Sequence, residues 1–139
     1  MIFVEKGAFR FNLQDMRVLC LTCETDLLAK VSTVFADQIN TLDTVTDPGQ
    51  FLAAANSSSA DVFMIDYDQI HLVYPNPVDL VKKMPPHSPT LVIGSSSFAD
   101  WHQPLRNAGA LILHKPVTVG EIGLALRRLI TEAGKRPRK

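Results

Sequence analysis

The sequence has only two cysteines and no long hydrophobic run. Cys20 and Cys23 lie three residues apart, so a disulfide between them would not join distant parts of a fold, and packing must hold the chain together. The apolar stretches have the length of strands, well below the roughly 20 residues that a membrane-spanning helix needs. The first residues also lack the charged segment, apolar stretch and cleavage site of a secretion signal. We therefore expect a cytoplasmic protein with no membrane contact.

The chain also lacks an excess of charge of either sign. Its 139 residues carry 14 Lys and Arg against 14 Asp and Glu, and 46% of the residues are hydrophobic. This composition is typical of soluble globular proteins, and the length suits one domain. The one local excess is basic, at residues 134–139, which we interpret as a solvated tail or linker end. A nucleic-acid or anionic-surface contact of this tail is the alternative, and nucleic acid is not an expected partner of the domain itself.

From residue 16 onward, short apolar runs of β type alternate with stretches whose apolar residues recur every three to four positions. This alternation predicts βα units and a parallel sheet. Five units in this length predict a doubly wound, flavodoxin-like α/β fold with sheet order 2-1-3-4-5, helices on both faces and a working site at the carboxyl ends of the strands. The predicted strands are residues 17–22, 41–46, 61–66, 90–94 and 110–114.

Local signals predict some of the connecting structure as well. Thr118 and Glu121 form a capping box, which predicts the start of the last helix, and Gly134 predicts its end. We expect residues 67–71 to lie in a long loop. Pro104 should kink or shorten the helix before the fifth strand.

Residues 1–15 precede the predicted domain, which we place at residues 16–133. Two apolar runs flank Lys6 and Gly7, and their alternation predicts a small hairpin or extended arm. Such a hairpin is barely stable alone. It must therefore pack on the domain or on another chain, and we hypothesise a homodimer contact.

Chemically active side chains follow the predicted strands. Asp66 ends the third strand, Ser95 and Ser96 follow the fourth, and Lys115 follows the fifth. Because the carboxyl ends of parallel strands meet at one edge of a sheet, we expect these side chains to lie close together. An aspartate, a hydroxyl and an ammonium suit a phosphorylated carboxylate, with the aspartate as nucleophile and the others as contacts of the phosphoryl oxygens.

Because these residues follow the strands in this order along the sequence, the chain resembles the receiver domain of bacterial two-component response regulators over about residues 16–133. The resemblance rests on Asp61-Val-Phe-Met-Ile-Asp66, the strand at 89–95, Gly109-Ala110 and Lys115-Pro116. It implies a non-enzymatic signalling role, with a kinase, phosphotransferase or effector domain as partner.

The resemblance also implies roles for single residues. Asp66 matches the phosphoacceptor, Lys115 the lysine that contacts the phosphoryl group, and Gly94 or Ser95 the position of the switch hydroxyl. The same resemblance implies a contact surface on the fourth crossover helix, the fifth strand and the last helix. Its candidate residues are Leu105, Arg106, Arg127 and Arg128.

The positions expected to hold magnesium depart from the receiver pattern. Receivers usually end the first strand with two acids that hold the ion, and here those positions are Thr22 and Cys23, neither a hard anionic ligand. Glu24 and Asp68 are the carboxylates left for a displaced ion site. Since phosphoryl transfer relies on the metal to bridge donor and acceptor oxygens, we predict a degenerate receiver without a cofactor that acts as a phosphorylation-independent interaction module.

Two other functions remain open. The first is a working phosphoreceiver in which Asp66 accepts phosphate. The competing interpretation of Asp66 is an inert ion pair with Lys115. The second is a flavodoxin-like binder of a small molecule or cofactor, although no glycine-rich loop follows the first strand. A redox or metal role for the cysteines is a weaker reading, because residues three apart in a strand point to opposite faces and we expect Cys20 in the core.

Overall fold

The structure, a computed structural model, describes residues 17–34, 42–57, 60–71, 73–85, 88–95 and 100–135. It contains one five-stranded parallel sheet of order β2-β1-β3-β4-β5, so the predicted doubly wound fold is confirmed. The N-terminal extension, Ser96 and residues 136–139 lie outside the described residues. The strands are β1 (Val18–Leu21), β2 (Leu42–Val45), β3 (Val62–Asp66), β4 (Thr90–Gly94) and β5 (Leu111–His114).

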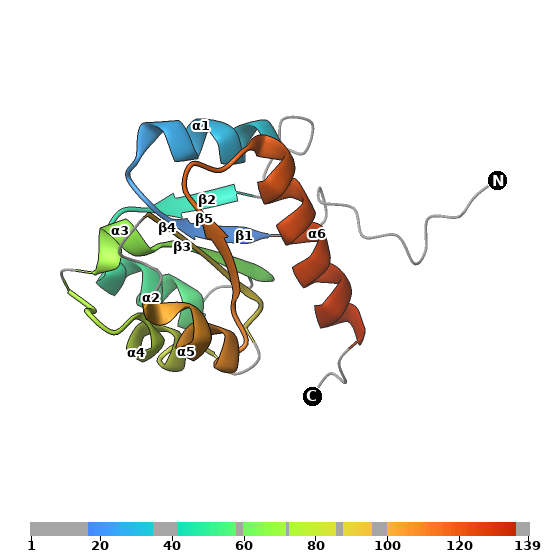
Figure 1. The fold of residues 1–139 in the computed structure, drawn as a ribbon. Helices are drawn as coiled ribbons and strands as arrows, with labels where there is room; N and C mark the ends of the chain where they lie inside the picture. Colours follow the sequence, from blue (N-terminus) through green and yellow to red (C-terminus); the bar gives the residue numbers. More distant parts are fainter. Residues whose placement is uncertain are drawn as a thin grey trace.

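Helices cover both faces of the sheet (Figure 1). One face carries α1 (Thr25–Val34) and α6 (Val119–Lys135). The other carries α2 (Pro48–Ser57), the short α3 (Tyr67–Ile70), α4 (Pro77–Lys82) and α5 (His102–Asn107). No helix among the described residues is long and apolar enough to cross a membrane.

The central strands explain the two-layered core. Every residue of β1, β3 and β4 is buried, as the near-continuous apolar runs predict for strands covered on both sides. Alternate side chains serve opposite layers: Met64 packs toward α1 and α6, whereas Ile65 packs toward the other helices. The parallel register then brings the carboxyl ends of the strands to one edge.

Capping interactions fix the last crossover. The Thr118 amide donates to Glu121 Oε1 at 2.9 Å and the Glu121 amide donates to Thr118 Oγ1 at 3.0 Å, which confirms the predicted capping box. Before β5, Gly109 takes a φ of 95° directly after α5, a left-handed conformation that favours glycine at the end of a helix.

Two local expectations were wrong. Residues 67–70 form α3 rather than a loop, because the Asp66 carboxylate caps the turn and Tyr67 and Ile70 are buried. The last helix continues through Gly134 to Lys135. Pro104 lies in the first turn of α5, which is six residues long, and there the missing N–H has no partner to lose.

Candidate functional site

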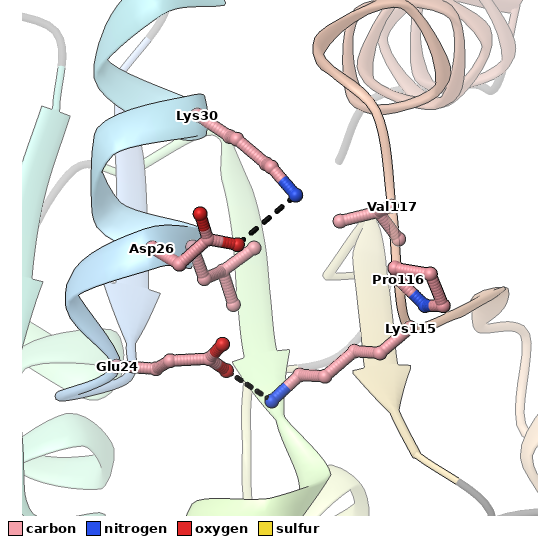
Figure 2. A pocket seen from close by; sticks show the side chains of 7 residues that line it. Glu24, Asp26, Lys30, Lys115, Pro116 and Val117 are labelled. Atoms are coloured by element: carbon pink, nitrogen blue, oxygen red, sulfur yellow. Dashed lines mark hydrogen bonds and ion pairs between the residues drawn. The ribbon is translucent and has the colours of Figure 1, made fainter.

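Four charged side chains meet at the carboxyl edge of the sheet. Lys115, just after β5, places its Nζ 2.5 Å from Glu24 Oε1, 2.9 Å from Asp66 Oδ1 and 2.9 Å from Asp68 Oδ2. Glu24 comes from the loop after β1, Asp66 from the end of β3, and Asp68 from the first turn of α3. We call these four residues the lysine cluster; Figure 2 shows Lys115 reaching across to Glu24.

Asp66 is the most enclosed member of the lysine cluster. Its side chain is 0% exposed. Oδ1 accepts from Lys115 Nζ and from the Asp68 amide at 3.0 Å, and Oδ2 accepts from Thr22 Oγ1 at 2.7 Å. Both carboxylate oxygens therefore have protein donors, and neither is open to solvent.

Thr22 holds Asp66 from the opposite side to Lys115. It is fully buried, and besides donating to Asp66 its Oγ1 accepts from the Glu24 amide at 3.1 Å. One hydroxyl thus fixes the carboxylate and shapes the turn that leads to Glu24. By its sequence, Thr22 was only a missing acid. Its role follows from the strand register, in which Leu21 pairs with Ile65 and Thr22 therefore lies beside Asp66, and no pattern in the sequence states that register.

Ser95 contacts a carboxylate. Its amide and its hydroxyl both donate to Asp68 Oδ1, at 3.3 Å and 2.9 Å. The structure thus brings Asp66, Lys115 and Ser95 to one edge as expected, with Asp68 lying between Ser95 and the ammonium.

The cluster shifts the titration of two of its members. Burial by itself would lower the pKa of Lys115, but its hydrogen bonds to the three carboxylates outweigh burial and hold the pKa above the ordinary 10.5. Burial by itself would raise the pKa of Asp68, but the bonds from Lys115 and Ser95 outweigh burial and hold the pKa below the ordinary 3.8. Both groups are therefore charged at neutral pH.

Solved structures share this fold, whereas no protein-family model and no curated protein matches the sequence. Full-length FixJ from B. japonicum matches with a TM-score of 0.72 at 14% identity, over 86% of this chain and 60% of that one. A response regulator receiver domain protein from Clostridium thermocellum matches with a TM-score of 0.64 at 18% identity, over 86% and 97%. NtrX from Brucella abortus matches with a TM-score of 0.67 at 21% identity, over 85% of this chain.

This chain has the fold of a response-regulator receiver domain. It spans 27% of the NtrX chain and 60% of the FixJ chain.

Magnesium, which the receiver fold implies, fits these donors poorly. The positions of the usual acid pair hold Thr22, already bonded to Asp66, and Cys23, a soft ligand. Glu24 and Asp68, the candidates for a displaced site, both bind the Lys115 ammonium, which would repel a divalent cation. Within the described ranges, no three acidic, histidine or cysteine side chains are grouped so that they could hold a metal ion.

The two cysteines of this receiver fold occupy different environments. Cys20 is buried, and desolvation together with the nearby Asp66 charge raises the pKa of its thiol from 9.0 to about 12. Cys23 is exposed and its Sγ donates to Gln69 Oε1 at 2.6 Å. The expectation that Cys20 belongs to the core is confirmed.

The predicted contact residues of the receiver surface differ in exposure. Leu105 is 0% exposed and belongs to the core layer of α2 and α4, so its assignment as a surface contact was wrong. Arg106, Arg127 and Arg128 are exposed. The helix α5 is amphipathic, and Leu105 lies on its inner side.

A small cavity adjoins the lysine cluster between α1 and the loop after β5 (Figure 2). Its volume is about 230 Å³, below the roughly 300–1,000 Å³ typical of small-molecule sites. Its charged groups pair with one another: Asp26 with Lys30 at 3.0 Å, and Glu24 with Lys115. This cavity does not favour the alternative of a cofactor binder.

The lowered pKa of Asp68 gives a prediction for acid stability. Since the folded pKa lies below the unfolded one, this carboxylate stabilises the fold above pH 3.8, and its contribution is lost as the pH falls through the folded pKa. We expect the free energy of unfolding to fall less steeply in Asp68→Asn than in the wild type between about pH 5 and pH 2. Urea unfolding across this range measures it. Asp26→Asn, whose side chain is 68% exposed, is the control and should keep the wild-type slope; an unchanged slope in Asp68→Asn would contradict the prediction.

Proposed function

We propose that this domain is a receiver-type signalling module that works through protein contacts, without phosphorylation of Asp66 and without an enzymatic activity of its own. The receiver fold supports the signalling role, since the matching structures include the response regulator receiver domain of Clostridium thermocellum. The lysine cluster supports independence from phosphorylation.

The observation that carries the proposal is the enclosure of Asp66. A phosphoacceptor must present a carboxylate oxygen to its donor in line with the leaving group. The Asp66 side chain is 0% exposed, and Thr22 and Lys115 hold its two oxygens from opposite sides. Attack on a phosphodonor would require one of these bonds to break.

Charge compensation points in the same direction. In phosphoryl transfer a divalent cation neutralises the developing negative charge. Here the one ammonium of Lys115 already compensates three carboxylates, Glu24 included. A phosphoryl group would add negative charge to a site whose cation is shared.

The partner that this function implies is a signalling protein in the cytoplasm: a kinase, a phosphotransferase or an effector domain. Arg106 on α5, with Arg127 and Arg128 on α6, offers it exposed cationic contacts. A constant conformation of the lysine cluster would let such a partner bind without a phosphorylation signal.

Intact mass spectrometry after incubation with acetyl phosphate and Mg²⁺ tests the proposal. We expect no gain of one phosphoryl group in the wild type, because its nucleophile is enclosed. Asp66→Asn, which keeps the shape of the side chain, is the matched control, and a conventional receiver treated in parallel shows that the reagent is active.

A phosphoryl group gained by the wild type and absent from Asp66→Asn would overturn the proposal and establish a working phosphoreceiver. The contact between Asp66 and Lys115 is the observation in favour of that second function. Circular dichroism of both proteins before and after incubation ensures that only folded protein is compared.

A further inference from the structure

The outer face of α6 carries an apolar side chain that this fold leaves uncovered. Leu124 is 70% exposed, and it and Val73 are the exposed large hydrophobic residues of the described part of the chain. Gly120 and Arg127 lie on the same face of the helix, one turn to either side of Leu124. A leucine in this position gains stability only if something outside the fold covers it.

A groove runs beside Leu124. It lies between α6 and the end of α1 and has a volume of about 360 Å³. Its lining residues are Thr33 and Val34 of α1 and Val119, Gly120, Gly123, Leu124 and Arg127 of α6. Arg127 is the charged group of the lining, and the Thr33 hydroxyl already donates to the Ala29 carbonyl oxygen. The other walls are apolar or small, so an aliphatic side chain from outside would pack against them.

No contact within the described part of the fold explains why residue 123 is a glycine. In the interior of a helix, glycine is less stabilising than alanine. Yet a Cβ built at Gly123 would meet no atom within 4 Å among the described residues. A second helix that packs closely on this face would benefit from the missing side chain.

The charged residues of this face lie symmetrically about Leu124, with opposite signs on its two sides. Glu121 lies three residues before Leu124, and Arg127 lies three residues after it. In an antiparallel pair of identical helices centred on Leu124, each Glu121 therefore lies opposite an Arg127 of the other copy, and the pair occurs twice. Glu121 uses only Oε1 for the capping box, and Arg127 takes part in no ion pair within the ranges that the structure describes.

We propose that α6 packs against α6 of a second copy of this chain, antiparallel and two-fold symmetric about Leu124, with Glu121 and Arg127 paired across the interface. The groove receives the second copy's leucine, and the two ion pairs fix the direction of the helices. The interface is separate from the lysine cluster, so it does not depend on whether Asp66 accepts phosphate.

Light scattering of the whole chain over a range of concentrations tests this pairing. We expect the wild type to reach twice the mass of one chain. Arg127→Glu and Glu121→Arg should each remain monomeric, because each homodimer would place like charges opposite one another. An equimolar mixture of the two should form a dimer again, since both cross-interface pairs are then of opposite sign.

Leu124→Arg provides a second test that leaves the capping box intact. It changes an exposed side chain, so the fold should be retained, and the dimer should dissociate at concentrations at least about tenfold higher than those at which the wild type dissociates. Arg106→Glu, on α5, should dimerise as the wild type does. A monomeric wild type at every concentration, a mixture that stays monomeric, or a Leu124→Arg dimer of wild-type affinity would overturn the proposal.

Discussion

Replacing Lys115 with methionine is expected to lower the free energy of unfolding by about 3–5 kcal/mol. Methionine keeps much of the aliphatic length but removes the ammonium, so the buried Asp66 loses its cation and Glu24 and Asp68 repel it without compensation. Removing one partner of a buried ion pair costs far more than the pair contributes when intact, because a charge stays behind in a medium of low polarity. Urea unfolding near neutral pH, followed by circular dichroism, measures the change.

The same substitution at Lys30 is the matched control. Lys30 pairs with Asp26 at the surface, one helical turn away, and Lys30→Met should change stability by less than about 0.5 kcal/mol. Adding Asp66→Asn to the Lys115→Met variant should recover part of the loss, since a neutral amide needs no cation. If Lys115→Met cost as little as Lys30→Met, the lysine cluster would contribute little to the fold.

Leu105→Ala is expected to lower the free energy of unfolding by about 2–5 kcal/mol. Leu105 is 0% exposed and packs in the layer that also holds Val78, Leu80 and Ala110. Truncating it removes apolar contacts and leaves a cavity that the short α5 can only partly close. Thermal or urea unfolding measures the loss.

Arg106→Ala, at the neighbouring exposed position, is the control and should change stability by less than about 0.5 kcal/mol. A stable Leu105→Ala variant would contradict the assignment of Leu105 to the core. It would also return this residue to the candidate contact surface.

Strand positions were predictable because their burial is encoded locally. The apolar run ending at Asp66 predicts a strand covered on both faces, and β3 occupies it. The capping box at Thr118 and Glu121 was equally readable, because both partners lie within one turn. Leu105 was misassigned because a six-residue helix with one buried residue has too little periodicity to show which side faces the sheet.

The short helix α3 shows the opposite case. Four residues carry no helical period, and this turn forms because the Asp66 carboxylate caps it and the core accepts Tyr67 and Ile70. The capping by Asp66 and the burial of Tyr67 and Ile70 both depend on where β3 ends in space. No sequence pattern within residues 67–70 predicts either of them.

The sequence by itself determined the parallel strands and the kinds of side chain at their carboxyl ends, because strand periodicity and the βα alternation are local properties. The sheet order followed only from the doubly wound fold that this alternation predicts. The tertiary structure alone decided which of those side chains pair. Thr22 and Asp66 are 44 residues apart, and Glu24 and Lys115 are 91 residues apart. Their contacts depend on strand register and on the reach of a lysine side chain, which only the packed sheet brings together.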